Sequence, residues 1–319
     1  MMNIRNAVAT RHFIHKIVSR FSSKSGENML INILSNQGGI SVQVAEATKL
    51  INDACTAHKC SQIASVALGR TMVGNMLLAH GRDNNETCQV QINGNGVLGR
   101  ITSECVLNNG IMGSRGYVQY PQAQQSLRED GTLDISGAVG IGMVQVRRSH
   151  PAWKEPFSGS VMLETSEIAE DLAVYLCSSE QTNSVLWLFV DADHEGSVKT
   201  AMGYLCSVLP GCSEEELNIL EHTVTTMPNL QQAVKQGNIT ADGIADLLIN
   251  GLGEQFRHYV KVEGRCTCSK EKFLRGMLAL GRDELEDMIK KKEDIDVSCD
   301  WCNKSTRIAW SDLQELVST

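Results

Sequence analysis

The sequence is poor in several features that would place it in a specialised class. Its 319 residues include only 5 prolines, 27 glycines and 5% aromatic residues, which excludes collagen-like and low-complexity chains. The longest unbroken apolar run, residues 185–190, is far shorter than the roughly twenty residues that a membrane-spanning helix needs, so we expect no membrane contact. Positive charge is also scarce. The formal net charge is -8, whereas a general nucleic-acid binder needs a basic surface, so we expect no nucleic-acid partner.

The first 26 residues lack acidic side chains. Their charge is +5, which leaves -13 for the remainder, and it comes from Arg5, Arg11, Lys16, Arg20 and Lys24. An acid-free segment that contains Arg and Ser and is interspersed with apolar residues is typical of a mitochondrial presequence. We therefore expect a mitochondrial protein. The alternative is a cytoplasmic protein with a frayed N-terminus.

Cysteine is abundant by contrast, with eleven residues. An odd number in a chain without a secretory signal argues against a disulfide scaffold and favours a reducing compartment. Seven of the cysteines are scattered, mostly in apolar surroundings, and we expect them to fill the core. These seven are Cys55, Cys60, Cys88, Cys105, Cys177, Cys206 and Cys212.

The other four cysteines form two close pairs. Cys266 and Cys268 make a C-x-C motif, and after 30 residues Cys299 and Cys302 make a C-x-x-C motif. Two such pairs bring four thiolates to the corners of a tetrahedral zinc ion, so the spacing predicts one zinc per chain. A zinc site made of four cysteines has no open coordination position, which leaves structural or redox roles and excludes zinc hydrolysis.

No other group of residues suggests catalysis. His194, His222 and His258 are expected to be solvated or packing residues, because the cysteine site is already full. The sequence Gly94–Gly99 fits a G-x-G-x-x-G pattern, but strand-like residues follow it where a dinucleotide-binding fold needs a helix. We interpret it as a hairpin turn, and we predict no enzyme activity, no catalytic residue and no organic cofactor.

The N-terminal part of the chain mixes helical and strand patterns, which predicts an α+β domain with several antiparallel strands packed with helices. Residues 64–79 indicate a largely buried helix, and residues 30–34 and 42–51 contain helical spacing. Strand-like runs occupy residues 88–92, 100–106, 139–146, 159–163, 185–190 and 202–208.

The C-terminal third is predicted to be mostly helical. Ser213 and Glu216 form a capping box that opens the first of three short helices, over about 214–227, 230–236 and 241–249. Farther on, Ser269 caps a helix, Asp283 begins a second one, residues 295–297 form a short strand and Ser311 caps a last helix. The tail from residue 263 has few large apolar groups, so we expect metal binding to supply its folding free energy.

Zinc-bound cysteines are thiolates, which is the form that oxidants attack. Each close pair also keeps a second thiol beside any sulfenic acid that forms. Oxidation would therefore close local disulfides, release zinc and remove the energy that folds the tail.

The cysteine pattern, with SKEKFLRGMLALGRDELEDMI over residues 269–289 between its halves, resembles the thirty-three-kilodalton heat shock protein family of redox-regulated holdase chaperones. Segments 65–72 (SVALGRTM), 90–99 (VQINGNGVLG) and 175–181 (YLCSSEQ) are also similar to the N-terminal domain of that family. The resemblance covers roughly residues 29–316. Where the family usually has a Tyr-x-Phe pair, this sequence has Thr306 and Ile308, with Trp310 nearby.

The resemblance implies a function and a division into domains. Cys266, Cys268, Cys299 and Cys302 would bind zinc when reduced and form the disulfides 266–268 and 299–302 when oxidised. The oxidised protein would unfold its zinc module and linker, dimerise and hold unfolding client proteins without ATP. The implied parts are a presequence (1–26), an α+β domain for substrate binding and dimerisation (27–212), a helical redox-sensitive linker (213–262) and a zinc-binding redox switch (263–319). Together with the N-terminal segment, this suggests a eukaryotic, organellar family member.

Two other functions are compatible with four clustered cysteines. A constitutive zinc-ribbon interaction module would bind a partner in the reduced state, and salt-dependent RNA or DNA binding would reveal it. A disulfide oxidoreductase would cycle one C-x-x-C motif, although the βαβ context expected for that activity is missing.

Overall fold

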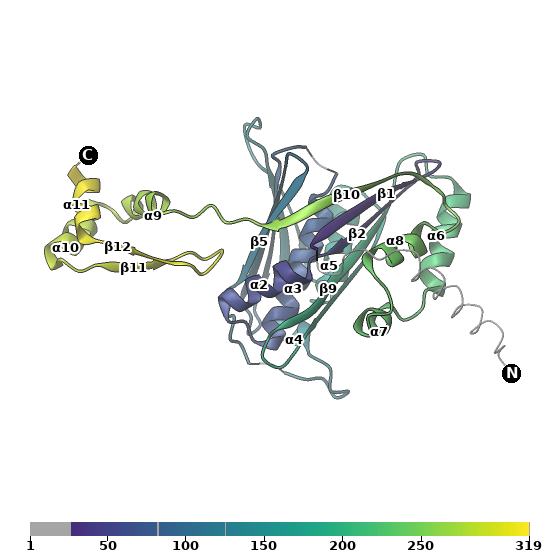
Figure 1. Cartoon of the computed structure of the whole chain (residues 1–319), viewed down its shortest axis with the longest axis horizontal. Helices are drawn as coiled ribbons and strands as arrows, with labels where there is room; N and C mark the ends of the chain where they lie inside the picture. The colour runs from purple at the N-terminus through teal and green to yellow at the C-terminus, as the bar shows by residue number, and fades with distance from the viewer. Residues whose placement is uncertain (1–26, 82, 125, 319) are drawn as a thin grey trace. The chain divides into compact units, whose positions relative to one another are not determined.

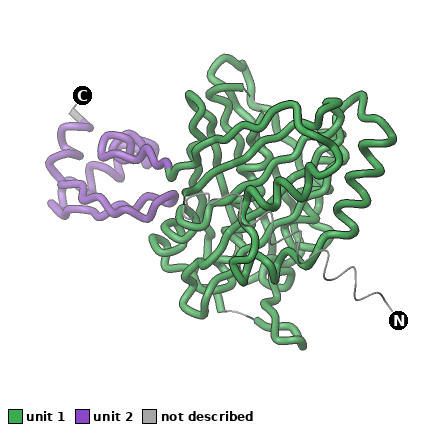
Figure 2. The backbone as a smooth tube through the Cα atoms, turned by 45° about the vertical axis from the view of Figure 1, so that its right-hand side comes forward, with its two compact units in different colours: residues 1–264 green, residues 265–319 purple. Residues whose placement is uncertain are grey.

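The computed structural model describes residues 27–318 except residues 82 and 125. The chain forms two compact units, one ending at Gly264 and one beginning at Arg265 (Figure 2). We call them the large unit and the tail unit. The expected presequence, residues 1–26, lies outside the described residues. In the described part of the chain, no helix has the length and apolar character needed to cross a bilayer.

A ten-stranded sheet forms the centre of the large unit, in the order β7-β6-β3-β4-β5-β10-β1-β2-β9-β8 (Figure 1). All neighbours are antiparallel except β5 and β10, which run parallel. The strands are β1 (Met29–Ser35), β2 (Ile40–Glu46), β3 (Thr87–Gly94), β4 (Arg100–Asn108), β5 (Ile111–Val118), β6 (Gly142–Ser149), β7 (Phe157–Met162), β8 (Ser184–Ala192), β9 (Val198–Val208) and β10 (Glu254–Gly264). The predicted α+β class is confirmed.

Helix α3 (Gln62–Ala79) lies on one face of this sheet and contacts strands from both of its halves. Only Gln62 and Arg70 of this helix are not buried, which confirms the buried helix predicted for residues 64–79. The other helices of this layer are α2 (Thr48–His58), α4 (Ile135–Val139) and α5 (Ala169–Glu180). The hairpin between β3 and β4 is also confirmed, because Asn93 pairs with Arg100 across the Gly94–Gly99 loop.

The helical spacing in residues 30–34 and 42–46 was misleading, because these residues form β1 and β2. The cause is burial on both faces. Leu30 packs on the α3 side of the sheet, whereas Ile31 and Ile33 pack on the opposite side. A strand that is covered twice loses the alternation of polar and apolar residues that would identify it. The strand predicted over 139–146 begins only at Gly142, since Ile135–Val139 is helical.

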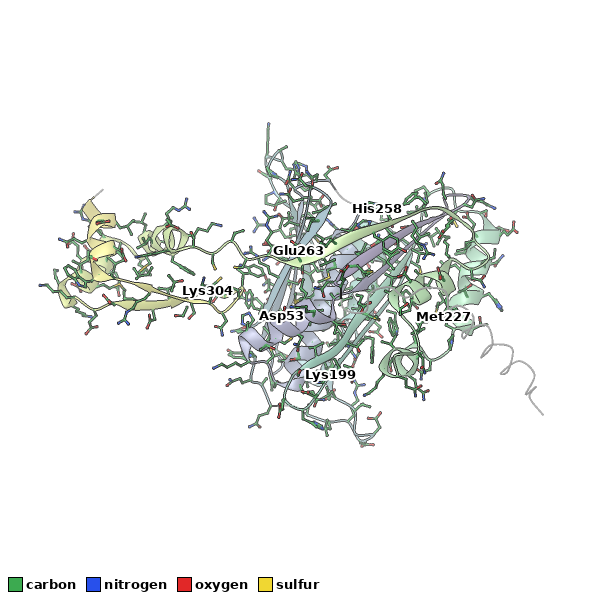
Figure 3. The ribbon with its side chains drawn as sticks, in the orientation of Figure 1. Asp53, Lys199, Met227, His258, Glu263 and Lys304 are labelled. Carbon is green, nitrogen blue, oxygen red and sulfur yellow. The ribbon has the colours of Figure 1, made fainter. Side chains whose placement is uncertain are left out.

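Three short helices cover the opposite face of β1, β2 and β9 (Figure 1). They are α6 (Glu214–Thr226), α7 (Leu230–Lys235) and α8 (Ala241–Ile249). The predicted capping box of Ser213 and Glu216 is present at the start of α6. Met227 lies at the C-terminal end of this helix (Figure 3).

The helical character expected for the whole segment 213–262 ends with α8. Residues from Glu254 onward form β10, which inserts between β1 and β5. Val260 and Val262 are buried while their neighbours are exposed, so the period of this stretch is two. Backbone pairing on both edges and burial of these β-branched residues explain why a strand forms here.

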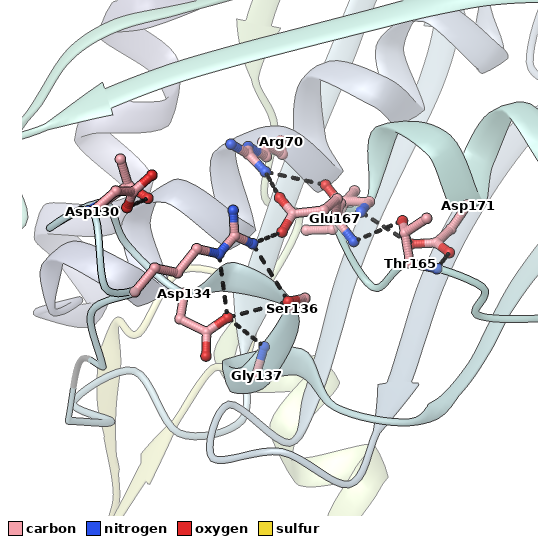
Figure 4. Close-up of polar contacts among 11 residues, drawn as sticks. Arg70, Asp130, Asp134, Ser136, Gly137, Thr165, Glu167 and Asp171 are labelled. Carbon is pink, nitrogen blue, oxygen red and sulfur yellow. Dashed lines mark hydrogen bonds and ion pairs between the residues drawn. The ribbon is translucent and has the colours of Figure 1, made fainter.

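A polar network fixes the turn that enters α5 (Figure 4). Asp171 accepts hydrogen bonds from the backbone N–H groups of Thr165 and Ile168, and Glu167 forms ion pairs with Arg70 and Arg128. Ile168 has a φ of 76°, which is rare for a β-branched residue. These contacts hold the strained turn in place.

The tail unit is small and has its own core. Its elements are α9 (Lys270–Met277), a 3-10 turn (Leu278–Leu280), α10 (Arg282–Lys291), β11 (Ile295–Ser298), β12 (Ser305–Ile308) and α11 (Trp310–Ser318). Ser269 caps α9 as predicted. The last helix begins one residue before Ser311, and its first turn is fixed by Asp312, whose carboxylate accepts the Ala309 N–H. Ile308 on β12 is fully buried.

Candidate metal centre

Four sulfur atoms meet in the tail unit. The Sγ atoms of Cys266, Cys268, Cys299 and Cys302 all lie within 4.8 Å of one another. The first two belong to the segment between β10 and α9, and the last two belong to the turn between β11 and β12. In the described part of the chain, this is the one group of three or more His, Cys, Asp or Glu side chains with metal-binding geometry.

The turn between β11 and β12 positions the second cysteine pair. Ser298 pairs with Ser305, and the Cys299 N–H donates to the Lys304 carbonyl at 3.1 Å. Asn303 has a φ of 54° and donates its N–H to the Cys299 carbonyl at 2.7 Å. This tight turn points Cys299 and Cys302 to the same side, and Lys304, which follows it, is labelled in Figure 3.

The spacing of the sulfurs fits a tetrahedral metal ion. Cys266 Sγ lies 3.7 Å from Cys299 Sγ, and Cys268 Sγ lies 3.6 Å from Cys302 Sγ. A zinc–sulfur bond of about 2.3 Å in tetrahedral geometry separates two ligands by about 3.8 Å. A disulfide would bring them to about 2.05 Å. The four residues therefore form a cluster that can hold a metal ion.

The thiols differ in how readily they ionise. Burial raises the pKa of Cys266, but hydrogen bonds from the Cys268 N–H and the Cys302 thiol outweigh it and lower this pKa to about 7. Burial raises the pKa of Cys302 to about 12, and the hydrogen bond with Cys266 raises that of Cys268. One thiolate is thus available near neutral pH, and metal binding would release protons from Cys268 and Cys302.

The four cysteines are unequally accessible. Cys266 is exposed, Cys268 and Cys302 are partly exposed, and Cys299 is buried. A soluble oxidant can therefore reach the cluster without prior unfolding, and it meets the thiol with the lowered pKa first.

The seven scattered cysteines lie in the large unit, apart from this cluster. Five are buried as expected, whereas Cys177 is exposed and Cys212 is partly exposed. Cys177 follows the buried Leu176 on α5, and one helical residue corresponds to a rotation of about 100°, which turns its side chain outward. An apolar neighbour in sequence is thus a poor guide to burial on a helix.

The three histidines considered above also lie outside the cluster, and none of them is buried. His194 contacts the Gln62 side chain at 3.2 Å, and His258 lies on β10 (Figure 3). Strand β12 and Asn303, which shape the second cysteine turn, were not anticipated. Asn is favoured in turns because it tolerates a positive φ, so Asn303 was the available signal for a turn there.

Comparison with known proteins assigns the family. The family model described as "Hsp33 protein" matches residues 28–309. This chain belongs to the Hsp33 family. The match includes all four clustered cysteines and most of the described chain.

Hsp33 relatives cover nearly the whole chain. A 33 kDa chaperonin of Geobacter sulfurreducens is 34% identical over 288 residues, covering 90% of this chain and 94% of the relative. The 33 kDa chaperonin of Desulforamulus reducens is 33% identical over 291 residues, covering 91% and 97%. The crystal structure of the 33 kDa chaperonin (HSP33) of Thermotoga maritima superposes with a TM-score of 0.83 at 27% identity, covering 92% of this chain and 98% of that one. These relatives are bacterial and give no support to a eukaryotic, organellar origin.

Proposed function

We propose that this Hsp33 family member is a redox-regulated, ATP-independent holdase chaperone. In the reduced state, Cys266, Cys268, Cys299 and Cys302 hold one zinc ion and the protein is inactive. Oxidation forms the disulfides 266–268 and 299–302, releases zinc, unfolds the tail unit and the linker helices α6 to α8, and promotes dimerisation. The active form binds unfolding client proteins, and the proposal includes no catalytic turnover. The observation that carries it is the meeting of four thiols in a unit that has little else to fold it.

The size of the tail core supports a metal-dependent fold. Four apolar side chains of this unit are buried: Met277, Leu285, Ile308 and Leu313. Burying an aliphatic side chain contributes about 1.5–3 kcal/mol, which is small against the conformational entropy of more than fifty residues. Structural zinc contributes about 10–16 kcal/mol of apparent binding free energy. Sulfur ligands in tetrahedral geometry favour zinc among the abundant divalent metals.

Helices α6 to α8 provide the second component of the proposed switch. They cover an apolar face made by β1, β2 and β9, to which Ile31, Val42 and Tyr204 contribute. Isolated helices shorter than about 12–15 residues are only marginally stable in water. Helices α7 and α8 are shorter than this and α6 barely reaches it, so all three depend on packing against the sheet. Loss of the helices would uncover an apolar surface able to bind exposed segments of clients.

A few polar contacts fasten these helices. Glu216 accepts hydrogen bonds from the Ser35 hydroxyl at 2.5 Å and from the Gly39 N–H at 3.3 Å. Arg257 on β10 forms an ion pair with Asp246 on α8 at 2.5 Å, and the Tyr259 hydroxyl donates to Asp242 at 2.7 Å. Strand β10 leads directly into the tail unit, so the chain connects the metal cluster to the helices that it would release.

The decisive experiment compares reduced and oxidised protein. Zinc content, free thiols and oligomeric state are measured before and after treatment with peroxide at mild heat, and light scattering follows the aggregation of an unfolding client without ATP. We expect loss of about one zinc and of the four cluster thiols per chain, dimer formation and suppressed aggregation only after oxidation. Equal suppression by the reduced and oxidised proteins would contradict the switch, and a different metal in the reduced protein would contradict the zinc assignment.

We also propose mitochondrial localisation, supported by the acid-free, +5 segment of residues 1–26. A fusion of this segment to a fluorescent protein is expected to enter mitochondria. A fusion in which Arg5, Arg11 and Arg20 are replaced by Glu is the control and should remain in the cytoplasm. Cytoplasmic fluorescence from both fusions would contradict the proposal.

A further inference from the structure

Two pairs of cysteines in the large unit lie close together, although the sequence suggested only core packing. Cys55 and Cys60 lie at the C-terminal end of α2, and Cys88 faces Cys105 across β3 and β4. All four are buried, with exposed fractions of at most 4%. The backbone geometry of the two pairs differs, and the difference decides which can form a disulfide.

Helix α2 ends in a Schellman motif. Lys59 adopts the left-handed conformation with a φ of 55°, the Cys60 N–H donates to the Cys55 carbonyl at 2.9 Å, and the Lys59 N–H donates to the Thr56 carbonyl at 3.1 Å. In this motif the residue after the left-handed one contacts the side chain near the end of the helix. Those two positions are occupied here by Cys60 and Cys55, so the motif brings the two side chains together.

The Cys60–Cys55 backbone hydrogen bond also limits the distance between the two Cα atoms. Adding the N–Cα and Cα–O spans of standard backbone geometry to the hydrogen bond gives an upper limit of about 6.8 Å. Disulfides span Cα distances of about 4.4–6.8 Å. Cys55 and Cys60 therefore meet the backbone condition for a disulfide in the folded state.

Cys88 and Cys105 also fall within the Cα range, at about 5.5 Å, but the separation of their Cβ atoms is unfavourable. The Gln119 N–H, at the end of β5, donates to the carbonyl of Arg100 on β4. Successive residues of a strand direct their N–H and C=O groups to opposite sides, so the even-numbered residues of β4 form hydrogen bonds with β5. The odd-numbered residues, which include Cys105, then point these groups toward β3, and Cys105 forms a hydrogen-bonded pair with Cys88. The Cβ atoms of such pairs lie about 5.5 Å apart, whereas a disulfide needs about 3.5–4.5 Å. The Cys105 thiol instead contacts the Ser114 hydroxyl at 3.4 Å.

We propose that Cys55 and Cys60 are a second redox pair, which closes a disulfide in the folded large unit under peroxide stress. The Cys55 thiolate attacks the O–O bond of hydrogen peroxide, becomes a sulfenic acid and releases hydroxide, which takes up a proton to give water. The Cys60 sulfur then attacks the Cys55 sulfur, the S–S bond forms, and the sulfenic oxygen leaves as a second water with the Cys60 proton. Two electrons pass from the two thiols to the peroxide.

The environment assigns the two roles. The interaction with Cys60 lowers the pKa of Cys55, while the same interaction and burial raise the pKa of Cys60. Cys55 is thus the attacking residue and Cys60 the resolving one. Both are less accessible than Cys266, so this pair reacts more slowly than the metal cluster. The closed disulfide would secure the end of α2 after the tail unit has opened.

Peptide mapping of the full-length, zinc-loaded protein tests this proposal. After timed exposure to hydrogen peroxide, free thiols are alkylated and the protein is digested with trypsin. Because Lys59 separates the two cysteines, cleavage leaves Cys55 in peptide 50–59 and Cys60 in peptide 60–70. We expect these peptides to become covalently linked after zinc is released and to separate on reduction. Cys88 and Cys105, in peptides 83–100 and 101–115, are the matched control and should remain alkylated.

Three results would overturn the proposal. The first is separate recovery of peptides 50–59 and 60–70 after all four cluster cysteines have been oxidised. The second is a disulfide between Cys55 and a cysteine other than Cys60. The third is linkage of Cys88 to Cys105 as fast as linkage of Cys55 to Cys60. The last result would show that the large unit had unfolded. In Cys60→Ala we expect Cys55 to remain unlinked and zinc release to be unchanged. If this variant does not fold, the peptide map of the wild-type protein still tests the proposal. Linkage is read without a chaperone assay, so its failure is distinguishable from failure of the holdase activity.

Discussion

The large unit and the tail unit are stabilised by different means. The large unit buries apolar side chains on both faces of its sheet, around α3 on one side and beneath α6 to α8 on the other. The tail unit has four buried apolar side chains and four clustered thiols. Hydrophobic burial does not respond to oxidants, whereas thiolate ligation does. Under the proposed function, the tail unit is redox-sensitive because its apolar core is small and a metal ion supplies the missing stability.

Removing one cysteine from each unit should give the largest contrast. In Cys299→Ala we expect loss of zinc and of amide protection in β11 and β12, because about 10–16 kcal/mol of binding free energy depends on a complete ligand set. Cys206→Ala is the matched control, since Cys206 is also buried but lies in the large unit. Hydrogen exchange and zinc analysis measure both effects. Zinc retention in Cys299→Ala would show that the tail has another means of binding it.

A core truncation should produce the reverse pattern. Leu68 on α3 and Leu313 on α11 are both fully buried. Leu68→Ala should destabilise the large unit by about 2–5 kcal/mol in denaturant unfolding and leave zinc release unchanged. Leu313→Ala should accelerate zinc release under oxidation without shifting the unfolding of the large unit. Equal effects of the two variants on zinc release would mean that the units are not independent.

The tail unit should depend on pH through its metal. At pH 7 the raised pKa values of Cys268 and Cys302 keep these thiols protonated in the metal-free state, and below about pH 7 Cys266 is protonated as well. Binding therefore releases at least two protons, and affinity should rise about 100-fold or more per pH unit, since each proton contributes about 1.4 kcal/mol. Competition with a chromophoric chelator between about pH 6 and 8 measures the slope. A flat profile would exclude thiolate ligation.

The smallest effect is expected at α6, one of the three helices that cover β1, β2 and β9. Ser213→Ala removes the cap of α6 and should cost about 1 kcal/mol, seen as faster amide exchange in α6 and a lower temperature for activation. Ser311→Ala is the control, because Ser311 is exposed and Asp312 holds the first turn of α11. Exchange in α6 that is unchanged by Ser213→Ala would show that packing alone holds this helix.

The same contrast explains what could be predicted from the sequence. Cysteine spacing predicted the four-cysteine cluster, because metal ligation uses short-range pairs that are visible along the chain. Capping at Ser213 and Ser269 was visible for the same reason. Strands β1 and β2 were not visible in the sequence, because burial on both faces removes the alternation of polar and apolar residues that identifies a strand. The place of β10 between β1 and β5 depends on pairing with residues more than a hundred positions away, which no local pattern encodes.

The two thiol pairs of the large unit show a further limit. Cys88 and Cys105 are brought together by the register of β3 and β4, which follows from the hairpin but not from either residue. Cys55 and Cys60 are close in sequence, yet their contact depends on Lys59 adopting a positive φ. Spacing alone gave no reason to distinguish these residues from ordinary buried cysteines.

The insertion of β10 into the middle of the sheet has a consequence for recovery from stress. Residues 209–253 run between β9 and β10, two strands that are each paired on both sides. If α6 to α8 unfold, this segment becomes a loop whose two ends are held by β9 and β10. The entropic cost of bringing the ends of the loop together was met when the sheet folded, so refolding of the helices does not incur it again. Such a loop cannot diffuse away from the surface that it uncovers. Once thiols are reduced again, the helices need only re-form above their own docking site, so the closed state should return without a search for distant partners.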